Sequence, residues 1–97
     1  MIGPVDLARL VPGDWVDQTL LVLDVEQRGT DRPFTVLTLG NRTGRLTTAP
    51  VWPEERRRVA GIARGHVVHV TGEVTTWREA RQLRLTSIRL LPPDEID

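Results

Sequence analysis

Few side chains in this sequence have the chemistry that catalysis or metal binding requires. The chain has no cysteine and no tyrosine, a single serine, Ser87, and two histidines, His66 and His69. Without cysteine it can form neither disulfides nor thiolate metal sites, and two histidines are too few for a histidine-rich metal site. A hydrolytic triad would have to combine Ser87 with these histidines, and no motif supports one. We therefore expect a protein that is not an enzyme, has no catalytic residue, and uses no cofactor and no metal.

Arginine is the abundant functional side chain, and its distribution is uneven. All thirteen basic residues are arginine, and the formal net charge is zero. Residues 1–27 have a net charge of −4, residues 28–89 of +7, and residues 90–97 of −3. A basic segment between acidic ends indicates an anionic partner for the middle of the chain. A solvated arginine-rich surface would show the same pattern.

Length and hydropathy indicate one domain without a membrane anchor. Ninety-seven residues leave room for one core of ordinary size. The longest apolar run, residues 20–23, has four members, which is far too short for a transmembrane helix. The N-terminus has no basic region followed by an apolar stretch, so a secretory signal is not expected. We expect a cytoplasmic protein with no membrane partner.

The pattern of apolar and turn-forming residues predicts five strands and one short helix. Apolar and β-branched segments predict strands at residues 15–27, 34–39, 46–52, 66–74 and 81–91. A hairpin is expected at 40–44 and a loop at 75–80. The helix should follow Pro53, which suits a first helical position, and should stop at Gly65.

This element order is that of an all-β OB-fold, a five-stranded Greek-key barrel with one short helix between strands 3 and 4. Residues 11–91 are expected to form the OB-fold domain, residues 1–10 an N-terminal arm, and residues 92–97 an acidic tail or linker. Strand alternation predicts the barrel core, which comprises Leu21, Leu23, Leu37, Leu39, Leu46, Val68, Val70, Leu83 and Leu85.

Several segments resemble the tRNA-anticodon/helicase type of OB-fold. Residues 32–44 resemble its strand-two hairpin, with Asn41 where that family usually has aspartate, and residues 65–74 and 82–90 resemble its strands four and five. The Gly-Asp-Trp-Val motif at 13–16 is similar to the start of the N-terminal OB domain of HD-type 3′–5′ exoribonucleases, which residues 11–91 resemble most. The resemblance implies binding of single-stranded DNA or RNA. The HD catalytic domain is absent, so no nuclease activity carries over.

A site for single-stranded nucleic acid needs a basic groove for phosphates and aromatic faces for bases. Strand pleating places alternate residues of strand two on the face opposite its core leucines, with strand three beside them. The loops after strands one and four should flank this face and supply arginines and a tryptophan. The predicted nucleic-acid-binding residues are Arg28, Arg32, Phe34, Val36, Thr38, Arg45, Thr47, Trp77, Arg78, Arg81 and Arg84.

Other interpretations of these residues and of the chain stay open. Phe34 could instead close the barrel end, and Trp77 could fold back onto the barrel. Trp15 is expected to be buried, Trp52 to be a structural residue before the helix, and residues 56–58 to form a solvated helix face. The chain could also be a protein–protein adaptor with the same fold, or an accessory domain of a larger nuclease or helicase. The sequence favours neither DNA nor RNA and specifies no oligomeric state.

Overall fold

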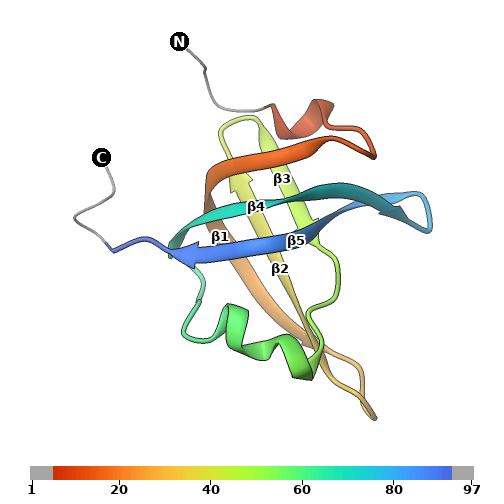
Figure 1. Ribbon diagram of the computed structural model, residues 1–97, viewed down its shortest axis with the longest axis vertical. Coiled ribbons are helices and arrows are strands. Elements are labelled where there is room, and N and C mark those ends of the chain that lie inside the picture. The colour runs from red at the N-terminus through yellow and green to blue at the C-terminus, as the bar shows by residue number, and fades with distance from the viewer. Residues whose placement is uncertain (1–5, 93–97) are drawn as a thin grey trace.

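Five strands close into a barrel in the computed structural model, which describes residues 6–92. Neighbouring strands follow the order β1-β2-β3-β5-β4 (Figure 1). This closed topology with a helix between β3 and β4 confirms the predicted OB-fold. The elements are η1 (Leu7–Arg9), β1 (Trp15–Arg28), β2 (Phe34–Asn41), β3 (Gly44–Thr48), η2 (Pro53–Val59), β4 (Val67–Trp77) and β5 (Ala80–Leu90).

Strand β1 is long because it pairs with two neighbours in turn. Its first half, residues 15–21, is antiparallel to β4, and its second half, residues 21–28, is antiparallel to β2. The register with β2 shifts between Val22 and Asp24, and a bulge of this kind bends a strand. The bend lets β1 cross from one side of the barrel to the other (Figure 1).

Most of the predicted core is confirmed, but the facing of β1 was wrong. Leu37, Leu39, Leu46, Val68, Val70 and Leu83 are buried. In β1 the buried residues are Leu20 and Val22, whereas Leu21 is 41% exposed. Four consecutive apolar residues, 20–23, do not specify which face points inward. Leu23 and Leu85 are only partly buried.

The segment after β3 differs from the predicted strand, which was expected to reach Trp52. Strand β3 ends at Thr48, and Val51 then forms an isolated bridge with Thr35. Two backbone hydrogen bonds join Val51 and Thr35, at 2.8 and 2.9 Å. Helix η2 is a 3₁₀ helix that ends at Val59, before the predicted end at Gly65. Gly61 has a φ of 79°, which is not a right-handed helical conformation.

The β4–β5 connection is a two-residue turn, which corrects the loop expected at 75–80. Trp77 pairs with Ala80, so only Arg78 and Glu79 lie between the strands. Both have positive φ, 50° and 66°. Positive φ at both central residues matches the right-handed twist of paired strands. The turn usually contains glycine or asparagine, and their absence here explains why the sequence did not predict it.

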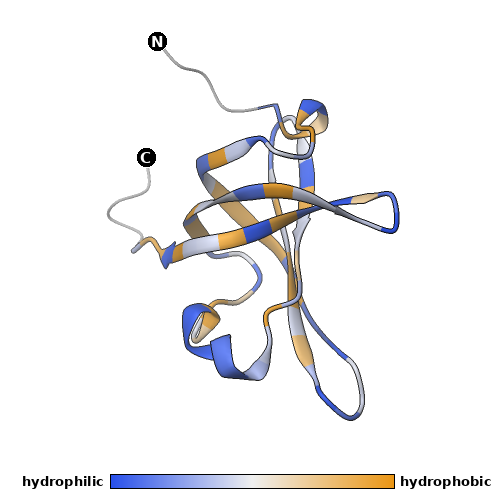
Figure 2. Cartoon of the chain, turned by 45° about the vertical axis from the view of Figure 1, so that its right-hand side comes forward, coloured by the Kyte–Doolittle hydropathy of each residue, from blue (hydrophilic) through white to orange (hydrophobic). Residues whose placement is uncertain are grey.

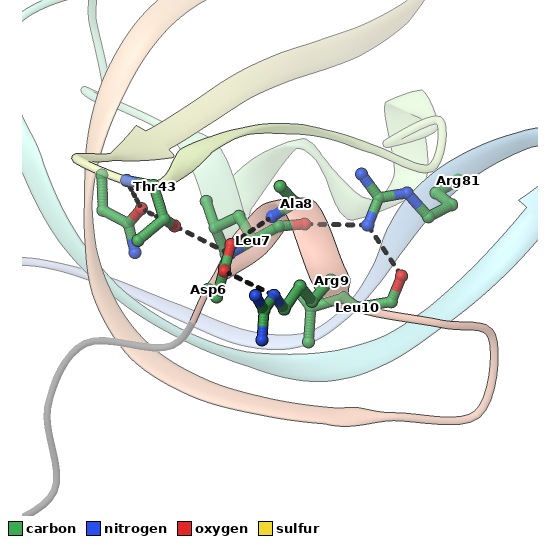
Figure 3. Close-up of polar contacts among 8 residues, drawn as sticks. Asp6, Leu7, Ala8, Arg9, Leu10, Thr43 and Arg81 are labelled. Atoms are coloured by element: carbon green, nitrogen blue, oxygen red, sulfur yellow. Dashed lines mark hydrogen bonds and ion pairs between the residues drawn. The ribbon is translucent and has the colours of Figure 1, made fainter.

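Residues 6–10 pack against the barrel, although the sequence suggested an arm outside the domain. Leu7 is completely buried, and its N–H donates to Thr43 Oγ1 at 2.8 Å. The Arg81 guanidinium donates to the carbonyl oxygens of Leu7 and Leu10, at 2.8 and 2.7 Å (Figure 3). The barrel unit therefore begins no later than Asp6. Residues 1–5 of the expected arm and 93–97 of the expected tail lie outside the described residues.

Hydrophobic and hydrophilic residues alternate along the strands, as Figure 2 shows for β4 and β5. Neither helix within residues 6–92 is long and apolar enough to cross a membrane. The same residues contain no group of three or more histidine, aspartate or glutamate side chains that could hold a metal ion.

Candidate nucleic-acid interface

A cavity of about 510 Å³ lies between the hairpin loops of the barrel, and we call it the aromatic cavity. Its walls come from the end of β1, the start of β2, the segment after β3, and the β4–β5 hairpin. Three of its lining residues are aromatic and one is charged. It is lined by Arg28, Phe34, Val36, Pro50, Trp52, Trp77 and Gln82.

The bridge between Val51 and Thr35 builds the aromatic wall of this cavity. Because Val51 pairs with Thr35, the adjoining residues Trp52 and Phe34 lie side by side. Their ring centroids are 5.0 Å apart, and the ring planes are inclined by 56°. A tilted pair at this spacing is a favourable aromatic contact. It holds both rings in place without a ligand.

Trp77 completes the cavity from the opposite hairpin. It is the last residue of β4 and is 61% exposed. The Arg78 guanidinium lies 5.5 Å from the centroid of its ring, within the range of a cation–π contact. The indole is therefore supported on one side by Arg78 and leaves surface open to solvent.

Two arginines at the other rim are held by carboxylates. Arg32, in the β1–β2 loop, lies 4.7 Å above the Trp52 ring and forms an ion pair with Glu54 of η2. Arg28 forms an ion pair with Glu26 at 2.9 Å. These contacts orient both cations along the cavity rim, and they also neutralise part of its positive charge.

Both ion pairs change the ionisation of their acidic partners. The hydrogen bond from Arg28, assisted by its charge, holds the pKa of Glu26 below its ordinary value of 4.5, and the same pair raises the pKa of Arg28. The backbone N–H of Glu54, followed by the hydrogen bond from Arg32, lowers the pKa of Glu54. Both carboxylates are therefore charged at neutral pH.

Beyond the aromatic cavity, the sheet face carries both signs of charge. Thr38 and Thr47 are direct cross-strand partners on this face, and Arg45 lies next to them, exposed at the start of β3. On the other side of β2, Asp24 lies opposite Thr38, and directly opposed residues share a face. The predicted groove is consequently less basic than the segment charge suggested.

The structure thus separates the eleven predicted site residues into groups. Thr38, Arg45 and Thr47 lie on the sheet face described above. Arg28, Phe34, Val36 and Trp77 line the aromatic cavity, and Val36 is buried at its wall, only 6% exposed. Arg32 and Arg78 lie at the rim. Arg81 donates through Nη1 to the carbonyl oxygens of Leu7 and Leu10, at the N-terminal segment of the barrel. Arg84 lies elsewhere, in a second cavity.

The second cavity, which we call the charged cavity, has a volume of about 560 Å³ and shares Pro50 and Trp52 with the first. It lies between η2, β5 and the start of β1. Trp15, at its edge, is 58% exposed, which corrects the expectation that it is buried. The functional groups around it are those of Trp15, Trp52, Glu55, Arg58, Glu73 and Arg84.

Sequence reasoning missed Trp52 as a site residue and gave no role to Pro50 and Gln82. Trp52 has an extended backbone, with φ −76° and ψ 161°. Pro53 follows it, and a residue before proline favours this conformation. That signal indicated that Trp52 lies outside the helix. The pairing of Val51 with Thr35, which places Trp52 against Phe34, leaves no local signal.

Comparison with known proteins supports the fold. No protein-family model matches the sequence, and no curated protein matches it. Among solved structures, the crystal structure of the p204 HINb domain is similar, with a TM-score of 0.70 and 18% sequence identity. The match covers 92% of this chain and 47% of that one, so this chain spans about half of its length. At this identity the likeness shows a shared fold. It supports the OB-fold but not the narrower tRNA-anticodon/helicase type.

Proposed function

We propose that this chain is a non-catalytic module that binds single-stranded DNA or RNA in the aromatic cavity. The observation that carries the proposal is the convergence of Phe34, Trp52 and Trp77 between the two hairpin loops, with arginines at the rim. Stacking on aromatic faces combined with a cationic rim is the arrangement that holds single strands with little sequence preference. A base would enter against Trp77, while its flanking phosphates approach Arg28, Arg32 and Arg78.

The finer assignment also belongs to this proposal. The likeness of residues 11–91 to the N-terminal OB domain of HD-type exoribonucleases favours an accessory role, in which this barrel delivers a strand to a catalytic domain on another chain or segment. RNA and DNA differ at the 2′-hydroxyl. Parallel titrations with labelled oligo-dT and oligo-U therefore test which of them the cavity prefers.

Trp77→Ala provides a direct test of stacking. Loss of one stacking surface costs about 1–3 kcal/mol, so affinity for oligo-dT, measured by fluorescence anisotropy, should fall about tenfold. The melting temperature should change little, because the side chain is 61% exposed. Leu90→Ala is a matched control, since Leu90 is an exposed apolar residue that lines neither cavity. Equal affinities of Trp77→Ala and the parent would contradict the site.

The salt dependence of binding tests the cationic rim. If three phosphates contact Arg28, Arg32 and Arg78, a plot of log K against log salt should have a slope of about −2. Replacing Arg56 and Arg57 together by glutamine should leave this slope unchanged, because both side chains are exposed on η2 and line neither cavity. Equal slopes for the parent and for a variant without Arg28 and Arg32 would argue against phosphate contact.

One observation favours a second candidate function, a protein–protein adaptor that uses the same cavity. Arg28 and Arg32 already have acidic partners, and Asp24 lies on the neighbouring sheet face. An aromatic cavity with a partly neutralised rim suits an apolar side chain of a partner protein. In that case oligonucleotides would bind weakly, and Trp77→Ala would leave that weak binding unchanged.

A further inference from the structure

The charged cavity continues the aromatic cavity on the other side of Trp52. The two cavities share Pro50 and Trp52, so they are neighbours and one strand can contact both. Trp15 also lines the charged cavity, and more than half of its surface is exposed. The second cavity is therefore lined by two aromatic side chains, Trp15 and Trp52.

Its charged groups are balanced and available to a ligand. Glu73 and Arg84 are direct cross-strand partners, yet no ion pair within 4.0 Å joins them, and within the described part of the chain neither has another. Across the cavity, η2 contributes Glu55 and Arg58, and the Arg58 guanidinium donates to the Leu85 carbonyl oxygen at 3.3 Å. Two carboxylates and two guanidinium groups thus surround the space.

The equal numbers of carboxylates and guanidinium groups disfavour binding of a phosphate in the charged cavity and favour binding of the edge of a base. Two carboxylates repel a phosphodiester, whereas the aromatic cavity presents arginine alone as its charged lining residue. A base edge can accept from a guanidinium and donate to a carboxylate at the same time. Guanine combines the O6 and N7 acceptors that arginine prefers with the adjacent N1–H and N2–H₂ donors that match a carboxylate.

We propose that the charged cavity is a second nucleobase site that selects guanine, with Trp15 as a stacking face and Glu73 and Arg84 as the groups that read the base edge. The inference rests on the proposed function, because the strand enters through the aromatic cavity. It adds a sequence preference to a module that the aromatic cavity alone would leave non-selective.

Labelled oligonucleotides of two lengths separate the two sites. A thymidine trinucleotide should occupy the aromatic cavity alone, whereas a strand of about eight nucleotides should reach both, as the usual site size of an OB-fold permits. We expect Trp15→Ala to weaken binding of the octamer about tenfold and to leave the trinucleotide unaffected. Trp15→Phe should restore most of the loss. Trp77→Ala should weaken both ligands.

Base identity is tested by placing one guanine in turn at each position of the thymidine octamer. The best position should bind about tenfold more tightly than thymidine alone. Glu73→Gln should remove this preference without changing the affinity for all-thymidine octamer. Inosine, which lacks the N2 amino group but keeps N1–H, O6 and N7, should lose part of this preference in the parent, and it should lose nothing further in Glu73→Gln.

The outcomes distinguish the two proposals. If the parent binds the octamer in a Trp77-dependent manner but shows neither a guanine preference nor any effect of Trp15→Ala, the second site is wrong and the proposed function stands. If the parent binds no oligonucleotide, both are overturned. Circular dichroism melts of each variant show whether a lost affinity comes from unfolding.

Discussion

Two of the arginines around the aromatic cavity, Arg28 and Arg32, are held in ion pairs before any ligand arrives. Arg28 is held by Glu26, and folding lowers the pKa of that carboxyl. The pair therefore stabilises the folded state at neutral pH, and this contribution is lost as the pH falls through the folded-state pKa of Glu26. A phosphate that binds Arg28 must compete with this carboxylate. The exposed pair consequently adjusts ligand affinity more than it adjusts stability.

Glu26→Gln should strengthen binding of oligo-dT at neutral pH, because it releases Arg28. The salt slope should stay at about −2, because Arg28 already counts among the three phosphate contacts of the parent. In the parent, acidification should have the same effect only below pH 4.5, the ordinary value from which the pKa of Glu26 is lowered. Thymidine is the suitable base because it gains no proton in this range. Anisotropy titrations across salt and pH measure both effects.

Asp31→Asn is the control for this prediction. Asp31 lies in the β1–β2 loop, and its replacement by asparagine changes the net charge by the same amount without releasing Arg28. An equal gain from both variants would show that general electrostatics, and not the release of Arg28, accounts for the effect.

At the scale of the elements, the tight β4–β5 turn sets where Trp77 and Arg78 lie. Arg78 and Glu79 both adopt a left-handed backbone, which is unfavourable for residues with a side chain. The strained turn nevertheless stacks Arg78 on Trp77 and keeps the hairpin short. The backbone strain is thus found next to the candidate site, as is common for functional turns.

Glu79→Gly should stabilise the protein by about 0.5–1 kcal/mol, because glycine adopts positive φ without the steric cost but loses more entropy on folding. Urea unfolding measures the change. Oligonucleotide affinity should stay the same, since Trp77 and Arg78 are retained. A lower midpoint for Glu79→Gly than for the parent would mean that the Glu79 side chain makes a stabilising contact in solution.

The sequence predicted the strands well and the connections poorly, for identifiable reasons. Alternation over β2, β4 and β5 placed Leu37, Val68 and Leu83 in the core, because a single buried face determines the register. The Thr35–Val51 bridge and the Arg78–Glu79 turn depend on distant pairing and on a backbone conformation rare for those residues. Since these two features position Trp52 and Trp77, the composition of the site could be predicted more fully than its geometry.

At the scale of the whole molecule, the N-terminal segment closes one end of the barrel while η2 lies at the other (Figure 1). Leu7 is buried in the core, and Arg81 of β5 holds two carbonyl oxygens of the η1 segment. Arg81 therefore has a structural role that the sequence did not suggest. It connects the hairpin that carries Trp77 to the start of the chain.

Leu7→Ala should cost about 2–5 kcal/mol, the usual range for a buried leucine, and Arg81→Ala about 1–3 kcal/mol through lost hydrogen bonds. Urea unfolding measures both. Arg84→Ala, an exposed neighbour on the same strand, should change stability little and serves as the control. The salt slope for oligo-dT should be the same in Arg81→Ala and the parent. A shallower slope for Arg81→Ala than for the parent would mean that Arg81 contacts a phosphate.

The placement of the tryptophans determines how the fluorescence of the protein responds to unfolding and to a ligand. The chain has three tryptophans and no tyrosine, so its near-ultraviolet emission comes almost entirely from indole. Two of these indoles, Trp15 and Trp77, are hydrated in the folded state, and their emission already resembles that of an unfolded chain. The spectrum should therefore shift little on denaturation, with Trp52 as the main source of change. All three indoles line the two cavities, so a base that stacks on any of them should change the emission.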